Sequence, residues 1–116
     1  MLWMRIAAGV GFLAVAFGAF GAHALRDRVA PNLLSAYQTG VLYQLVHAAA
    51  LFALALYARA TSSSIALPAA LWLAGMTLFS GSLYAMALTG ATRLGMITPF
   101  GGLCLLGGWI AIFFVR

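Results

Sequence analysis

The sequence predicts an all-α fold, a polytopic membrane protein built as an antiparallel bundle of four transmembrane helices. Two observations lead to this prediction. Of the 116 residues, 66% are hydrophobic and only 6% are charged, far outside the composition of soluble globular domains. The apolar residues also form four runs, each near the roughly 20 residues that a helix needs to cross a bilayer. A chain this short cannot bury so much apolar surface within itself, so lipid must cover the rest.

Charged and turn-forming residues separate the four runs and set the expected helix boundaries. We place helices at residues 3–25, 37–58, 66–88 and 98–115 of one transmembrane domain, 1–116. Asn32, after Pro31, is the expected N-cap of the second helix, whose first turns then lie in the interface ahead of residue 37. Thr98, before Pro99, is the expected N-cap of the fourth helix. The connectors are short, which makes helices that are neighbours in sequence antiparallel.

Small residues recur at helical spacing in the first and fourth predicted helices. Gly18 and Gly21 share a face of the first helix at 100° per residue, and Gly101 and Gly108 share a face of the fourth. Small side chains let helix backbones approach closely, which stabilises helix pairs where lipid removes the hydrophobic driving force. We expect these four glycines to be helix-packing residues.

Polar side chains gather on one stripe of the second helix and on the helix that follows it. We expect these side chains to form a polar intramembrane cluster, namely Tyr37, Gln44, His47, Ser80 and Tyr84. An unpaired amide or imidazole in hydrocarbon costs several kcal/mol, so the stripe must face the bundle interior and find partners such as Tyr84, Ser80 or water. The cluster is either an internal hydrogen-bond network or a path for a proton or solute.

The remaining polar residues do not suggest a catalytic or metal site. Asp27 is the only carboxylate and lies between Arg26 and Arg28, and no nucleophile has a recognisable partner spacing. His23 and His47 are offset along their helix axes by about 10 Å, which disfavours joint ligation. We therefore expect no enzyme activity, no catalytic residue, no metal and no cofactor, with a single-ligand haem or quinone at His47 as an alternative.

The six arginines are dispersed along the chain and do not form the basic patch of a nucleic-acid interface. They lie at the ends of apolar runs, where arginine reaches lipid headgroups. In the predicted topology three arginines lie on each side of the membrane. Arg5, Arg59 and Arg116 lie on one side, and Arg26, Arg28 and Arg93 lie on the other. The arginine count therefore does not decide the orientation.

Four motifs in order resemble the uncharacterised membrane family called domain of unknown function 423 (YgdD-like). They are GAFGAHAL at 18–25, YQTG at 37–40, LFSGSLY at 78–84 and ITPFGG at 97–102, so the resemblance spans essentially the whole chain. It implies a small bacterial inner-membrane protein with both termini cytoplasmic, and it implies no known activity.

Two functions follow as hypotheses. The first is a non-enzymatic structural or accessory bundle that self-associates or joins a larger membrane complex, with membrane lipid as its surroundings. The alternative is transport or permeation of a small solute, proton or lipid through a polar cavity around Gln44 and His47. Transport requires the cluster to line a hydrated cavity, whereas a structural role leaves its polar atoms bonded in a dry core.

Overall fold

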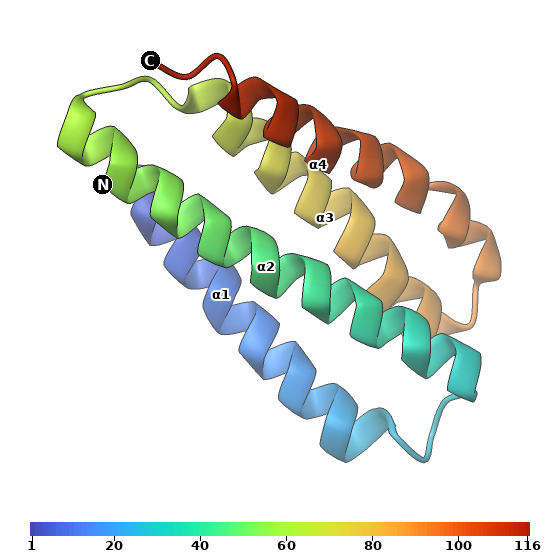
Figure 1. The fold of residues 1–116 in the computed structure, drawn as a ribbon. Helices are drawn as coiled ribbons and strands as arrows, with labels where there is room; N and C mark the ends of the chain where they lie inside the picture. The colour runs from blue at the N-terminus through green and yellow to red at the C-terminus, as the bar shows by residue number, and fades with distance from the viewer.

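The structure, a computed structural model, describes residues 1–116 and is helical apart from short turns (Figure 1). The elements are α1 (Leu2–Phe20), the π-helix η1 (Gly21–Leu25), α2 (Pro31–Thr61), α3 (Ala66–Thr89), the 3-10 helix η2 (Thr92–Met96) and α4 (Thr98–Ile112). Four segments are long and apolar enough to cross a membrane: Leu2–Leu25, Pro31–Thr61, Ala66–Thr89 and Thr92–Ile112. The predicted all-α fold with four transmembrane helices is confirmed.

The second helix is longer than the predicted range 37–58. It begins at Pro31, whose missing N–H costs nothing in the first turn, and it ends at Thr61, where Ser62 adopts a left-handed conformation with φ 58°. Its 31 residues span about 46 Å, more than the about 30 Å of hydrocarbon. The ends of α2 therefore extend into the headgroup region or require a tilt.

The two expected N-caps are wrong. Ala30 caps α2 and Ile97 caps α4, and neither helix has a side-chain cap bond. Thr98 lies within the first turn of α4, and its hydroxyl is instead 2.6 Å from the Ser82 hydroxyl of α3. Because Thr98 is the first helical residue rather than the residue before the helix, its hydroxyl is not in the capping position, and it joins α4 to α3 instead.

The fourth helix ends at Ile112, earlier than the predicted residue 115. The N–H groups of Phe113, Phe114 and Val115 bond to carbonyls three residues back, which is the tighter pattern common at helix ends. At the other end of α4, η2 occupies most of the expected connector 89–97 and extends the apolar segment.

The four helices form an open layer in which each helix packs on its neighbour in sequence. Backbone contacts join α1 to α2, α2 to α3 and α3 to α4, whereas α1 and α4 share no comparable contact (Figure 1). The layer measures 47 × 26 × 16 Å, and both termini lie at the same end. The inner helices α2 and α3 are therefore covered on two sides, and α1 and α4 are the edges.

Two clusters of buried side chains hold the layer together. The larger cluster centres on Trp72 and Leu51, and the smaller one contains Tyr37, Tyr84 and Leu25. Large apolar side chains elsewhere face outward, including Phe12 of α1 at 73% exposure and Leu103 of α4 at 65%. Lipid or another protein must cover these side chains, as expected of a membrane-spanning chain.

Candidate functional site

The predicted polar cluster lies at the junction of the inner helices. The Tyr84 hydroxyl donates a hydrogen bond to Oε1 of Gln44 at 2.6 Å, and Oγ of Ser80 donates to the Gly40 carbonyl at 2.6 Å. Both bonds join α2 to α3 and are buried. Each satisfies a side chain that would otherwise carry an unpaired polar atom in an apolar surrounding.

The same cluster also holds the first helix. Nε2 of Gln44 donates to the Val10 carbonyl at 2.9 Å, and the Tyr37 hydroxyl donates to the Phe17 carbonyl at 2.6 Å. Gln44 thus uses its amide oxygen towards α3 and its amide nitrogen towards α1. One side chain of α2 connects three helices.

His47 faces a different neighbour, Trp109 of α4. The indole Nε1 of Trp109 donates to Nε2 of His47 at 2.9 Å, and Nδ1 of His47 lies 2.8 Å from the Tyr43 carbonyl. An indole N–H only donates and a carbonyl only accepts, so both bonds form together only in the neutral tautomer that carries its proton on Nδ1. The geometry therefore assigns this tautomer, in which His47 has no free nitrogen.

Trp109 is the member of the site that sequence reasoning missed. The Trp72 ring packs beside both partners, with its centroid 4.6 Å from that of Trp109 and 5.9 Å from that of His47. Trp109 remains 44% exposed, so its apolar ring contacts the surroundings while its N–H is used inside. The signal that could have identified Trp109 is its position within a predicted spanning segment, whereas tryptophans usually lie at the membrane interfaces.

Two glycines bring the tyrosines into place. A Cβ on Gly21 would lie 2.5 Å from Cε1 of Tyr37, and a Cβ on Gly40 would lie 2.9 Å from Cε1 of Tyr84. The rings of Tyr37 and Tyr84 consequently pack with centroids 5.0 Å apart. A larger residue at either position would push a ring away from its hydrogen-bond partner.

The other predicted packing glycines lie between helices, with different tolerances. A Cβ on Gly101 would overlap the backbone of Phe79, and one on Gly108 would overlap the Trp72 ring. A Cβ on Gly18 would come only within 3.2 Å of a Val41 methyl group. The sequence did not single out Gly75, where a Cβ would lie 2.6 Å from a Leu105 methyl group.

Two apolar grooves flank the cluster on the outside of the layer. One of about 340 Å³ lies between α1 and α3 beside Gln44 and Tyr84, and one of about 360 Å³ lies between α2 and α4 beside His47 and Trp109. No group of three or more His, Cys, Asp or Glu side chains that could hold a metal is present. His23 is exposed in η1, whereas His47 is buried.

Comparison with known sequences shows which family this chain belongs to. Residues 17–102 match the sequence profile of the family described as protein of unknown function (DUF423). The chain belongs to this family. Among similar relatives, the UPF0382 membrane protein YwdK of Bacillus subtilis is 44% identical, over 86% of this chain and 83% of its own length. A UPF0382 membrane protein of Haemophilus influenzae is 41% identical, over 95% of this chain and 89% of its own length.

A further relative carries a location in its name. The UPF0382 inner membrane protein YgdD of Escherichia coli is 40% identical, over 85% of this chain and 76% of its own length. No solved structure matches the chain. This DUF423 protein is thus an integral membrane protein of an uncharacterised family, and nothing in the family points to catalysis.

The segment that matches DUF423 contains all five predicted cluster residues and Gly18, Gly21 and Gly101. Gly108 and Trp109 lie beyond its last matched residue. The bonds from Tyr37 to Phe17 and from Tyr84 to Gln44 therefore lie within the matched segment. The bonds from Gln44 to Val10 of α1 and from Trp109 of α4 to His47 each reach outside it.

Proposed function

We propose that this DUF423 protein has a non-enzymatic, structural or accessory role, in which it self-associates or joins a larger membrane complex. The observation that supports this most is that each of the five cluster side chains is hydrogen-bonded within the chain. The one buried side-chain polar atom without a partner is Nε1 of Trp72, outside the cluster. A fully bonded network fixes the arrangement of helices.

Transport through the cluster would need these bonds to open. A proton relay through His47 needs bonded partners that give and take protons, whereas its two nitrogens are bonded to the Tyr43 carbonyl and the Trp109 indole N–H, which do neither readily. Water reaching Gln44 would compete with the bonds to Val10 and Tyr84. A cluster whose side chains are all bonded to one another or to the backbone of the chain supports the structural role over permeation.

The open layer supplies surfaces on which another protein can pack. The outer face of α4 exposes Leu106 at 61% and Ile110 at 60%, and that of α1 exposes Phe12 and Val15. Because α1 and α4 do not close on each other, each groove beside the cluster has one edge helix as a wall. These faces fit a second copy or a larger complex.

The proposed location is the bacterial inner membrane with both termini in the cytoplasm. The Escherichia coli relative is named an inner membrane protein, and both termini of this chain lie at one end of the layer. Three arginines at each end leave the orientation to the resemblance alone.

Native mass spectrometry of the protein, released gently from membranes, tests this role. We expect a defined oligomer or a stable protein partner and no retained small solute, because the polar groups of the cluster are already bonded within the chain. One spectrum reports subunit count, partner and retained molecule together.

Tyr84→Phe is the matched control for that spectrum. It removes one cluster bond and leaves the outer faces unchanged, so the oligomer or partner should persist. A wild-type monomer that retains a solute, with the solute lost in Tyr84→Phe, would instead establish the cluster as a binding site and reject the structural role.

A further inference from the structure

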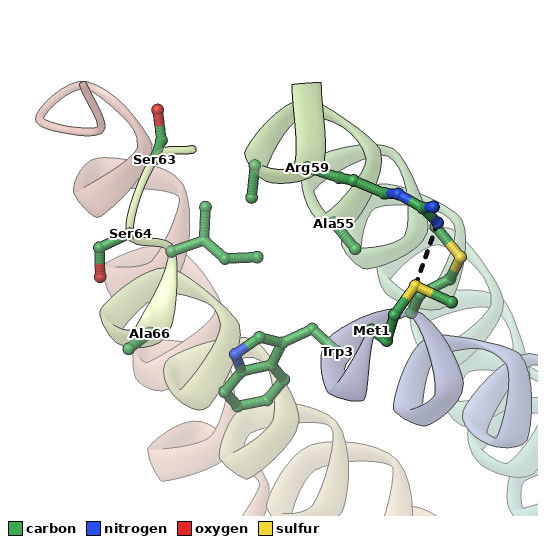
Figure 2. A pocket seen from close by; sticks show the side chains of 10 residues that line it. Met1, Trp3, Ala55, Arg59, Ser63, Ser64 and Ala66 are labelled. Carbon is green, nitrogen blue, oxygen red and sulfur yellow. Dashed lines mark hydrogen bonds between the residues drawn. The ribbon is translucent and has the colours of Figure 1, made fainter. Parts of the chain in front are cut away.

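The largest cavity lies away from the polar cluster, at the end of the layer that holds both termini (Figure 2). Its volume is about 450 Å³, within the range of small-molecule sites. The start of α1, the end of α2 and the start of α3 form it. Its lining is Met1, Trp3, Met4, Ala55, Ala58, Arg59, Ser63, Ser64, Ile65 and Ala66.

Arg59 brings a positive charge to this cavity that no carboxylate side chain of the protein balances. The chain's only acid, Asp27, lies in the turn before α2, at the opposite end of that 31-residue helix. The partner that Arg59 finds is the sulfur of Met1, at 3.1 Å from Nη1 (Figure 2). A thioether is a weak acceptor, whereas the forked guanidinium matches the oxygens of a phosphate.

Hydroxyl groups stand across the cavity from Arg59. Ser63 and Ser64 lie on the opposite wall in Figure 2, in the turn that leads into α3. The Ser63 hydroxyl is 2.7 Å from that of Thr61, and the Ser64 side chain is exposed. Neither hydroxyl points toward Arg59 in Figure 2, so each serine side chain must rotate about its Cα–Cβ bond to donate to an anion that Arg59 holds.

The inner part of the cavity is apolar. Trp3 lies across it on the side of the helices, with Arg59 and Ser63 at the outer edge (Figure 2). Ile65 is buried at 4% exposure, and Trp3 packs against the cluster to which Ile65 belongs. Tryptophan with a nearby arginine is the pairing found at the depth of lipid headgroups.

We propose that this cavity binds one anionic phospholipid. The phosphate lies against Arg59 and the serine hydroxyls, and the glycerol and first acyl carbons lie against Trp3 and Ile65. The shared chemistry is a phosphate, but the apolar inner wall and its place at the ends of membrane helices assign a lipid rather than free phosphate. This site is separate from the proposed structural role of the polar cluster.

A lipid titration by native mass spectrometry of the full chain in detergent tests the site. We expect phosphatidylglycerol to bind at one saturable site, roughly tenfold more tightly than zwitterionic phosphatidylcholine, because its net negative headgroup pairs with Arg59. Inorganic phosphate, added at increasing concentration, should not displace the lipid. Loss of the bound lipid as inorganic phosphate is added would reassign the cavity to a free anion. Equal binding of the two lipids would overturn the proposal.

Arg59→Gln, with Arg93→Gln as its matched control, separates this site from general attraction to a basic protein. Arg93 is an exposed arginine of η2 and does not line the cavity. We expect Arg59→Gln to weaken phosphatidylglycerol binding roughly tenfold and Arg93→Gln to leave it unchanged. Trp3→Ala should weaken both lipids, because it removes the apolar wall. Equal losses in the two arginine variants, with unchanged helical content and detergent melting temperature, would reject the site.

Discussion

At the scale of single residues, Gln44 does the most to connect the helices. Its oxygen accepts from Tyr84 of α3 and its nitrogen donates to Val10 of α1, so one amide satisfies itself while joining three helices. In a membrane the hydrophobic effect does not drive helices together, which leaves packing and such bonds to do so. The amide is therefore better understood as a helix connector than as a solute ligand.

Gln44→Leu should lower stability, because it removes both bonds and leaves the Tyr84 hydroxyl buried without its acceptor. We expect a loss of about 1–3 kcal/mol and a lower melting temperature in detergent, followed by circular dichroism. Gln38→Leu is the control, since Gln38 lies on the same helix with its side chain exposed. Equal melting temperatures for the two variants would show that the amide bonds contribute nothing.

At the scale of elements, glycines set how closely the helices approach. Gly101 and Gly108 place α4 directly against the backbone of Phe79 and the ring of Trp72 in α3. Gly9 and Gly81, in contrast, have nothing within 4 Å of a would-be Cβ. A glycine therefore marks a close helix contact only where an atom of another helix lies against it.

Gly101→Ala and Gly108→Ala should destabilise the layer by about 1–3 kcal/mol, because the added carbon has no room. Gly18→Ala should cost less, since a Val41 methyl group can shift. Gly9→Ala and Gly81→Ala are the controls and should be neutral or slightly stabilising, because alanine favours a helix more than glycine does. Phe114→Leu, at 77% exposure, should also be neutral. Melting temperatures of the variants in detergent measure these differences. An equal effect at all positions would show that Gly101 and Gly108 are not close helix contacts.

The element boundaries show where sequence reasoning works and where it stops. Run length follows from bilayer thickness, so four spans could be predicted from hydropathy. The capping residues could not, because Ala30 rather than Asn32 precedes the first turn of α2 and the Thr98 hydroxyl bonds to Ser82 rather than to its own backbone. Those choices depend on neighbours that only the folded chain supplies.

At the scale of the whole molecule, the arrangement of the helices as an open layer is the feature that could least be predicted from the sequence. Helices that are apolar on all sides carry no stripe that tells which neighbour they face, so a row and a closed bundle look alike in sequence. The polar stripe predicted that Gln44 must find partners in the interior. Trp109 could not be predicted as a partner of His47, because an indole tolerates the lipid boundary and requires no buried partner.

The proposed orientation predicts that both termini remain in the cytoplasm. A C-terminal green fluorescent protein fusion should fluoresce in Escherichia coli, and a C-terminal alkaline phosphatase fusion should be inactive, because that enzyme needs an oxidising compartment. A phosphatase inserted after Gly90, in the turn between α3 and η2, should be active and serves as the control. The reverse pattern would invert the orientation.

The central claim, that the intramembrane cluster is a closed internal network, is tested most directly by nitrogen-15 nuclear magnetic resonance of the histidine and tryptophan side chains in lipid nanodiscs. His47 should show the neutral tautomer protonated on Nδ1, and the Trp109 indole proton should exchange slowly with deuterated water. His23, exposed in η1, is the internal reference for fast exchange. Exchange of His47 and Trp109 as rapid as that of His23, with His47 averaging between tautomers, would contradict the claim and favour a hydrated path.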